Sequence, residues 1–181
     1  ISNRNITNAN STTSVNVTAN NLLLQAAGSV GAAGLNQAIN TNASYIENAA
    51  TGHVTGAIYI NAIDGVVLGD DSSANLRGLT SDNGPVYITA NNVGDGTLTA
   101  RKVTVNANAA ITLITNDGQG GLNDIVVGAI ITGTSAGGTV TLVSNNNITD
   151  EDSAATVDVT GYALRLQANG SVGTSGSNLN T

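Results

Sequence analysis

Two acidic clusters in turn-like stretches offer the clearest chemistry in this chain. Asp70 and Asp71 stand in the run DDSS, and Asp150 and Asp152 stand in the run DEDS. Carboxylate and hydroxyl oxygens gathered in a short turn are the ligands that Ca²⁺ prefers, although neither cluster has the spacing of an EF-hand. We therefore predict Asp70, Asp71, Asp150 and Asp152 as candidate calcium ligands. Solvated acidic turns without a bound ion are the alternative interpretation.

Candidates for catalysis are few. Enzymes that cleave polysaccharides use pairs of carboxylates, or an Arg or Lys base beside bound calcium. The basic side chains here include Arg77, Arg101, Lys102 and Arg165, and the single histidine, His53, has no evident partner. Solvated turn charges explain these residues equally well, and we expect His53 at the surface. We predict no catalytic residue and no cofactor other than the candidate calcium, so the chain is not expected to be an enzyme.

The elements that must position these groups are those of an all-β protein. The 181 residues contain no Phe, Trp, Met or Cys, and they include 22 Gly but only one Pro. The core must therefore be built from Val, Ile, Leu, Ala and Thr, which suit pleated sheet. No segment of about ten residues has a convincing helical period; residues 26–39 and 42–50 come nearest, and the glycines of the first argue against it.

Apolar residues recur at alternate positions, as in Val103/Val105 and Val140/Leu142, which is the period that buries one face of a strand. On this basis we predict strands at residues 14–18, 22–25, 57–62, 66–68, 86–90, 97–99, 103–106, 111–115, 125–127, 139–144, 156–160 and 164–166.

The end of the chain repeats its beginning. Residues 2–34 read SNRNITNANSTTSVNVTANNLLLQAAGSVGAAG, and residues 144–176 read SNNNITDEDSAATVDVTGYALRLQANGSVGTSG. The two runs align without a gap at the constant offset that separates Gly28 from Gly170 (170 − 28 = 142). Fixed-period self-similarity is typical of stacked, quasi-one-dimensional proteins. We predict one domain, 1–181, in which residues 2–143 form one long repeat and residues 144–181 begin the next copy.

A shorter repeat lies inside the long one. AIYINA (57–62) parallels PVYITA (85–90), and AITLITN (110–116) parallels TVTLVSN (139–145) at a similar spacing. Irregular coils of roughly 25–29 residues predict a parallel β-helix solenoid with about five coils in each long repeat. Aliphatic ladders then fill the interior, aligned Asn and Thr hydrogen-bond from coil to coil, and Tyr59 and Tyr87 stack on the outside. An antiparallel sandwich ranks second, because it gives no reason for self-similarity at two scales.

The charge balance excludes two classes of partner. A net charge of −7, with only five Lys and Arg residues, leaves no basic face for nucleic acid and weakens binding to anionic lipid. No stretch approaches the ~18 consecutive apolar residues of a membrane span.

Four runs carry a resemblance to a known family: GSVGAAGLNQAINT (28–41), GAIYINAIDGVVLG (56–69), the NNNITD…TVDVTG…LRLQANGSVG run (145–173) and GSVGTSGSNLNT (170–181). They resemble repeats of bacterial filamentous-haemagglutinin-type adhesins and related giant surface proteins. The resemblance implies a right-handed parallel β-helix that is exported and displayed at the bacterial cell surface. It carries over no receptor-binding motif.

These observations predict a structural or adhesive repeat segment of an extracellular bacterial surface fibre or filament, which gives length, stiffness and display. A carbohydrate-active β-helix enzyme, of the lyase or hydrolase kind, and a calcium-stiffened surface-layer or matrix protein are the alternatives. The expected partner is the protein itself, by end-to-end stacking of coils or by continuation in a longer chain. A host or neighbouring cell surface, or a polysaccharide, is the expected external partner.

Overall fold

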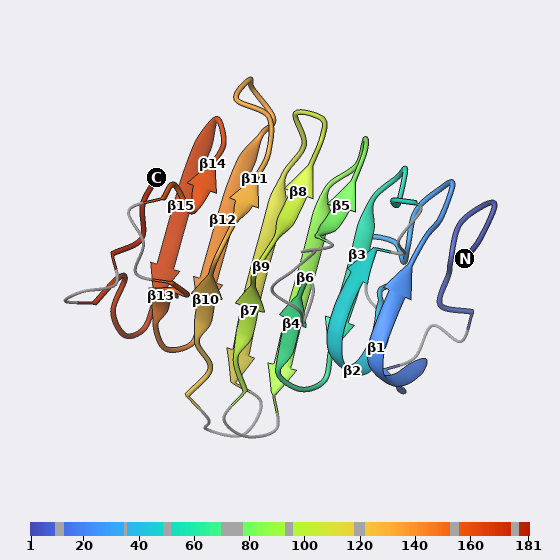
Figure 1. The fold of residues 1–181 in the computed structure, drawn as a ribbon. Helices are drawn as coiled ribbons and strands as arrows, with labels where there is room; N and C mark the ends of the chain where they lie inside the picture. The colour runs from blue at the N-terminus through green and yellow to red at the C-terminus, as the bar shows by residue number, and fades with distance from the viewer. Residues whose placement is uncertain are drawn as a thin grey trace.

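The chain folds as a parallel β-helix in which short strands stack coil upon coil (Figure 1). The computed structural model describes residues 1–9, 13–34, 36–48, 52–69, 78–92, 96–117, 122–152, 156–174 and 178–181. Its strands are β1 (Val17–Leu24), β2 (Ile39–Asn48), β3 (Ile58–Ala62), β4 (Val66–Leu68), β5 (Leu79–Ser81), β6 (Val86–Asn92), β7 (Leu98–Ala100), β8 (Val103–Val105), β9 (Ile111–Asp117), β10 (Ile125–Val127), β11 (Ile130–Ile131), β12 (Thr139–Ser144), β13 (Ile148–Asp150), β14 (Val159–Thr160) and β15 (Ala163–Ala168). The predicted all-β solenoid is confirmed.

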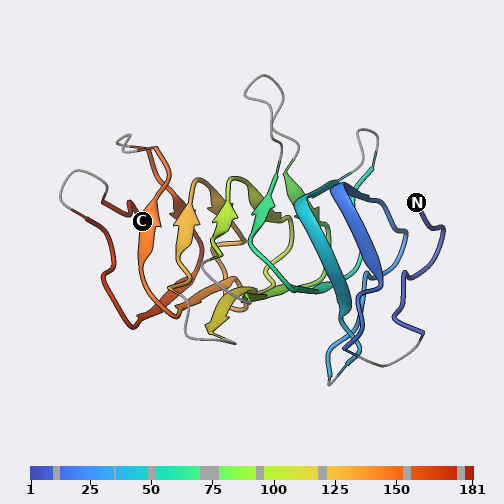
Figure 2. The ribbon, with the colours of Figure 1, turned by 90° about the horizontal axis from the view of Figure 1, so that it is seen from below.

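The strands line three walls of the solenoid. β2 pairs with β3 through residues 39–41 and with β4 through residues 45–46, so the eleven-stranded sheet turns a corner and supplies two walls. We call β3-β6-β9-β12-β15 wall A, β4-β7-β10-β13 wall B, and the four-stranded sheet β5-β8-β11-β14 wall C. Figure 2 shows the coils side by side from the N-terminal to the C-terminal end of the stack. Each coil therefore contacts mainly the coil before it and the coil after it.

Alternation along the strands explains the core. On wall A the ladder Ile58, Val86, Ile111 and Val140 is in register from coil to coil, and each member is fully buried. β-Branched and γ-branched aliphatic side chains of similar size fill this narrow interior without an aromatic residue. The outward-facing residues between them are more exposed, as the strand pattern of β12 illustrates.

The outer face carries the predicted ladders. Tyr59 pairs with Tyr87 in the next coil, and their ring centroids lie 6.2 Å apart with an interplanar angle of 32°. The Asn61 amide donates to Asn40 Oδ1 at 2.9 Å, and Thr89 Oγ1 donates to Asn61 Oδ1 at 2.9 Å. Both the stacked tyrosines and the coil-to-coil hydrogen bonds are thus confirmed.

Coil length varies more than the sequence predicts. Ile39 pairs with Ile60 in the next coil (60 − 39 = 21), whereas Leu68 pairs with Ala100 (100 − 68 = 32). The predicted coil length of roughly 25–29 residues is therefore too narrow a range. Corners absorb the difference, because residues added between strands leave the register on each wall unchanged.

The long repeat advances by five coils and one further wall. From Ile6 the parallel pairing runs through Val30, Ile58, Val86 and Ile111 to Val140, which is five coils along wall A. Ile148, the repeat partner of Ile6, lies on the next wall in β13. Ile6 and Val30 therefore lie on wall A, whereas their repeat partners Ile148 and Val172 lie on wall B.

The two copies nevertheless share a set of coil-to-coil hydrogen bonds at equivalent positions. The matched pairs are Ile6–Ser29 with Ile148–Ser171, Gly28–Arg4 with Gly170–Asn146, Gly31–Ile6 with Gly173–Ile148, Ser29–Asn5 with Ser171–Asn147, and Asn16–Asn40 with Asp158–Asn180. The repeat is thus a local bonding pattern between one coil and the next, and the wall that carries it is interchangeable.

Several strand predictions need correction. β2 covers most of residues 42–50, one of the two segments that came nearest to a helical period, and it was not predicted as a strand. Its buried positions include polar residues such as Asn40, Thr41 and Asn48, so the apolar alternation that marks other strands is missing. β5 and β13 were also missed, because the second of their two buried positions is polar, Ser81 and Asp150. β11 was missed because two residues are too few to show alternation. The strands predicted at 14–18 and 22–25 are joined in one strand, β1, which begins at Val17, and β14 is only Val159–Thr160.

Candidate functional site

Three carboxylates converge where wall B leads into wall C. Asp150 is the last residue of β13, Asp152 follows in the turn, and Asp158 precedes β14. One oxygen from each can be chosen so that all three lie within 4.8 Å of one another. Asp150 is 7% exposed and Asp158 is 1% exposed, whereas Asp152 is exposed. The cluster therefore reaches from the solenoid interior to its surface.

Strand alternation forces Asp150 inward. It occupies the wall B ladder that holds Leu68, Ala100 and Val127 in the three preceding coils. All three of those apolar residues are buried. Asp150 thus introduces a carboxylate at a position that is aliphatic in each of these coils.

The hydrogen bonds of the cluster leave two buried oxygens without a partner. The Asp152 N–H donates to Asp150 Oδ1 at 3.0 Å, and the Asn180 N–H donates to Asp158 Oδ2 at 2.7 Å. Asp150 Oδ2 and Asp158 Oδ1 are both buried and accept no hydrogen bond. Burial raises the pKa of Asp158, and the charges of Asp150 and Asp152 raise it further, against a lowering by the Asn180 N–H. Oxygen-only donors of this kind can hold a hard cation.

An ion pair across two coils holds the turn that carries the cluster. Arg101 Nε lies 2.7 Å from Glu151 Oε1, and the Glu151 N–H donates to the Val127 carbonyl at 2.8 Å. Gly128 lies between the two partners: a Cβ there would be 2.6 Å from Glu151 Oε2 and 3.0 Å from the Arg101 carbonyl oxygen. The missing side chain at Gly128 lets the Arg101 and Glu151 side chains meet over the intervening coil.

The structure gives different outcomes for the four predicted calcium ligands. Asp150 and Asp152 are brought together, and the structure adds Asp158, which was not predicted. Asp70 and Asp71 lie outside the described residues. The signal for Asp158 was present in the long repeat, because Asp150 and Asp158 align with Asn8 and Asn16 and are therefore amide positions that become carboxylates in the second copy.

In the first copy, neutral amides stand at the matching positions, where Asn8 is buried as Asp150 is, whereas Asn16 is exposed and Asp158 is not. The Asn16 Nδ2 group donates to Asn8 Oδ1 at 3.2 Å, and the Asn8 Nδ2 group donates to the carbonyl oxygens of Asn36 and Ala38 at 3.2 and 3.1 Å. At these positions the fold thus accommodates two side chains that are joined by a hydrogen bond. Two ionised carboxylates cannot make that bond, because neither has a hydrogen to donate.

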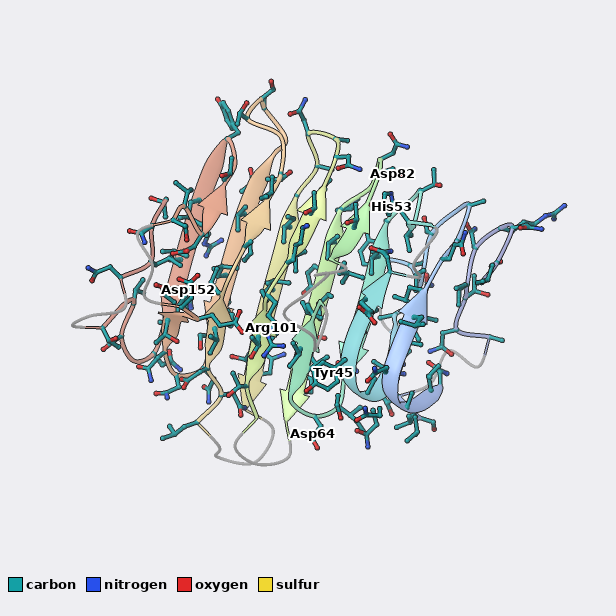
Figure 3. All side chains as sticks on the ribbon, viewed as in Figure 1. Tyr45, His53, Asp64, Asp82, Arg101 and Asp152 are labelled. Carbon is teal, nitrogen blue, oxygen red and sulfur yellow. The ribbon has the colours of Figure 1, made fainter. Side chains whose placement is uncertain are left out.

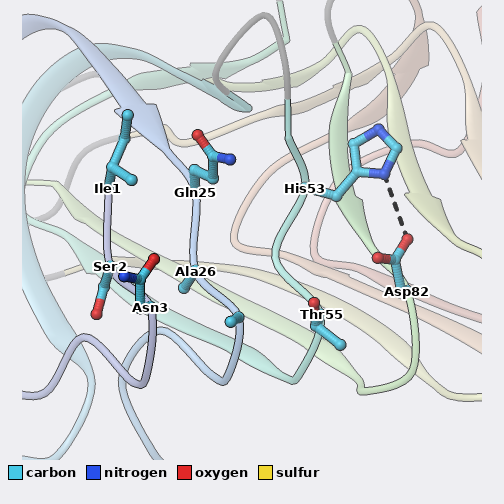
Figure 4. A pocket seen from close by; sticks show the side chains of 9 residues that line it. Ile1, Ser2, Asn3, Gln25, Ala26, His53, Thr55 and Asp82 are labelled. Atoms are coloured by element: carbon cyan, nitrogen blue, oxygen red, sulfur yellow. Dashed lines mark ion pairs between the residues drawn. The ribbon is translucent and has the colours of Figure 1, made fainter.

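His53 has a partner that the sequence did not reveal. Its Nδ1 atom lies 3.3 Å from Asp82 Oδ1, beside a hollow of about 230 Å³ that successive coils line (Figure 4). The Asn106 amide also donates to Asp82 Oδ1 at 2.9 Å. The expectation that His53 lies at the surface is confirmed, with 54% of its side chain exposed. The expectation of no partner is wrong, because stacking brings residues of neighbouring coils next to each other.

An imidazole–carboxylate pair can orient a general base, but such a base needs a nucleophile or bound water to act on. Within the described part of the chain, Asp82 is the one side-chain partner of His53. Figure 3 shows the His53–Asp82 pair well apart from Asp152, so the two groups of titratable side chains do not form one site.

A second hollow, of about 410 Å³, lies beside the tyrosine pair. Tyr59, Tyr87 and four small residues between 32 and 38 line it. Tyr87 is 38% exposed, so its ring is open to solvent. Aromatic faces of this kind can contact the apolar face of a sugar ring.

The remaining basic candidates form no group. Arg101 is engaged by Glu151, Lys102 immediately precedes β8, and Arg165 is exposed on β15. Arg77 lies outside the described residues.

No helix in the described part of the chain has the length and hydropathy needed to cross a membrane. Comparison of the chain with protein-family models, with curated proteins and with solved structures finds no match, so the site is interpreted from its own geometry.

Proposed function

We propose that this chain is a structural, adhesive segment of an extracellular bacterial surface fibre, to which it contributes length, stiffness and display. The observation that carries the proposal is the long repeat, whose hydrogen bonds recur on a different wall in the second copy. A repeat that can begin on either wall can be added to the solenoid in any number. Proteins built this way gain length with each repeat and keep a constant cross-section.

Further coils of the same type are the proposed partner. Val172 is 49% exposed on the open side of the last described coil, whereas Val30, its repeat partner, is fully buried between Ile6 and Ile58. Leu164 is likewise 36% exposed on β15. A coil equivalent to residues 39–60 would cover these apolar side chains as it does in the first copy, either from a longer chain or from a stacked subunit.

An enzyme that cleaves polysaccharides is supported less well. Glycoside hydrolysis needs two accessible carboxylates about 5–9.5 Å apart. In the cluster, one oxygen from each of the three carboxylates lies within 4.8 Å of the others, and two of the three residues are buried. Such side chains are out of reach of a polymer, and a structural role accounts for them more simply.

Small-angle X-ray scattering of chains with one, two and three long repeats tests the rod. Each repeat has slightly more than five coils, and strands in a sheet are about 4.8 Å apart, so each should add about 25 Å of length at constant cross-section. A matched series with Val140→Asp in every repeat should lose the rod, because it places a charge in the buried ladder. Scattering of the parent series as flexibly linked beads would contradict the proposal.

Location is tested separately. Antibodies against this chain should label the surface of intact producing cells in immunoelectron microscopy. Label confined to the cell interior would overturn the extracellular role even if the rod were confirmed.

A further inference from the structure

We propose that Asp150, Asp152 and Asp158 bind a calcium ion that fastens the turn between β13 and β14, and that the equivalent turn of the first copy is its metal-free counterpart. The inference does not depend on the proposed function, because it concerns how a charged cluster is tolerated inside a solenoid.

The first argument is the position of Asp150. Its ladder partners in the preceding coils are aliphatic and buried, so its carboxylate lies where this fold otherwise excludes charge. An ionised carboxylate out of water is strongly unfavourable unless it is paired or coordinates a metal. The Asp152 N–H satisfies only Asp150 Oδ1 and leaves Asp150 Oδ2 buried without a hydrogen-bond donor.

The second argument is that, independently of Asp150, Asp158 is buried as well. Its Oδ1 atom is also buried and without a donor, and the residue as a whole is only 1% exposed. One oxygen each from Asp150, Asp152 and Asp158 can lie within 4.8 Å of the others. Two unpartnered buried carboxylate oxygens beside a third carboxylate are explained by one cation that they share.

The third argument comes from the repeat itself. In the first copy Asn16 donates an amide hydrogen to Asn8, and Asn8 donates to two backbone carbonyl oxygens. Replacing both amides by carboxylates removes every one of those donors while the backbone bond from residue 158 to residue 180 is kept. A positive ion in the place of the amide hydrogens restores the lost interactions.

The donor set selects the ion. Carboxylate and carbonyl oxygens suit a hard cation, and neither His nor Cys belongs to the described cluster, which disfavours zinc. Ca²⁺ accepts an irregular shell of six to eight oxygens, whereas Mg²⁺ demands a near-ideal octahedron. After Gly176 the second copy is two residues shorter, so Asn180 matches Asn40 and Asn178 matches Ala38. The Ala38 carbonyl faces Asn8 in the first copy, so the Asn178 carbonyl is the expected fourth protein ligand.

Calcium bound here would join two coils. Asp150 ends the wall B strand of one coil, and Asp158 begins the wall C segment that follows and holds Asn180 of the next coil through its backbone and side chain. The ion would therefore stiffen the solenoid at one point of each repeat that carries these aspartates.

The test is calcium binding by the whole chain after dialysis against EDTA, followed by isothermal titration calorimetry and thermal unfolding in CaCl₂. We expect a dissociation constant in the range of about 10⁻⁴–10⁻³ M that is usual for extracellular calcium modules. At a hundredfold excess over that constant, the melting temperature should rise by about 5–10 °C. Sodium and magnesium chloride at equal ionic strength are the controls for screening and for ion size.

The decisive variant is Asp150→Asn with Asp158→Asn, which installs the residues of the first copy. It should fold, because the same scaffold already holds Asn8 and Asn16, and it should weaken calcium affinity at least a hundredfold. Asp152→Asn, at an exposed position, should weaken affinity about tenfold without affecting the fold. The reciprocal variant Asn8→Asp, Asn10→Asp and Asn16→Asp should add one bound calcium per chain.

Two results would overturn the proposal. One is a wild-type chain that neither binds nor is stabilised by calcium, which would mean that the carboxylates are neutralised in another way, such as by a retained proton. The other is a double variant whose calcium affinity and melting shift equal those of the wild type, which would place binding elsewhere in the chain.

Discussion

The two copies of the long repeat share a scaffold and differ in charge. Asn8 and Asn16 form a neutral, hydrogen-bonded pair in the first copy, and Asp150 and Asp158 form an acidic pair with unpartnered oxygens in the second. The bonds of Asn16 with Asn40 recur between Asp158 and Asn180. They therefore form with either an amide or a carboxylate at this position, and the buried carboxylates of the second copy need a positive ion or a proton to balance them.

The copies also differ in what covers them. Val30 is enclosed by a coil on each side, while Val172 pairs with Ile148 alone among the described residues. Equivalent sequence therefore has unequal burial, and the same substitution should have unequal consequences.

The largest expected difference is between Val30→Asp and Val172→Asp. The first places a charge at a fully buried position and should cost more than about 4 kcal/mol of unfolding free energy. The second affects a half-exposed side chain and should cost about 1 kcal/mol. Urea unfolding followed by circular dichroism measures both. Equal costs would show that another coil already covers Val172 in solution, for example through self-association at the concentration used.

The next effect distinguishes the two pairs directly. In EDTA, Asp150→Asn with Asp158→Asn should raise the unfolding free energy by about 1–3 kcal/mol, because it replaces two buried like charges by hydrogen-bonded amides. Urea unfolding at neutral pH measures the change. In saturating calcium the order should reverse, since only the wild type gains from the ion. An EDTA result in which the double variant is the less stable protein would contradict this account of the carboxylates.

Truncation to alanine at the position shared by Asn8 and Asp150 should change the free energy of unfolding differently in the two copies. Asn8→Ala leaves the carbonyl oxygens of Asn36 and Ala38 without their donor and should cost about 1–2 kcal/mol. Asp150→Ala in EDTA removes a buried carboxylate that has one hydrogen bond, from the exposed Asp152, and one oxygen without a donor, and should be neutral or slightly stabilising. Hydrogen exchange of the flanking amides, with calcium absent, reports each effect locally. Matched losses of protection in both copies would argue that Asp150 has a partner.

The smallest expected effect concerns the ion pair that the first copy lacks. Glu151→Ala recreates the Ala9 of the first copy and removes the pair with Arg101. Because the Arg101 and Glu151 side chains are 31% and 27% exposed, the cost should be about 0.5–1 kcal/mol and should shrink in high salt. A double-mutant cycle with Arg101→Ala measures the coupling. A coupling energy several times larger than this would mean that the pair is less screened than its exposure indicates.

Much of the architecture could be predicted because it is local. Alternation identified β3, β4, β9, β10 and β12, and the shorter repeat predicted the stacking that pairs Tyr59 with Tyr87. β2 could not be predicted in the same way, because its buried residues include the polar side chains of Asn40 and Asn48, which donate hydrogen bonds to carbonyl oxygens of the preceding coil. Their suitability for the interior depends on neighbours in another coil, which are distant in the sequence.

Only part of the candidate site could be predicted, because the rest of it also depends on residues that are distant in the sequence. Asp150 and Asp152 stand close together in an obvious acidic run, whereas Asp158 lies among apolar residues and joins them only when the chain turns from wall B to wall C. His53 and Asp82 likewise meet only by stacking.

The sequence by itself determined the all-β class, the coil as the stacking unit and the existence of the long repeat. The period of two along each strand follows from strand geometry, and the period of about 25 residues between coils follows from coil stacking. Only the tertiary structure decided which wall each copy occupies and which side chains are enclosed. The repeat is five coils and one wall long, so matching stretches meet different surroundings. Burial and proximity are properties of those surroundings, and they alone turn two aspartates of the second copy into a buried acidic pair.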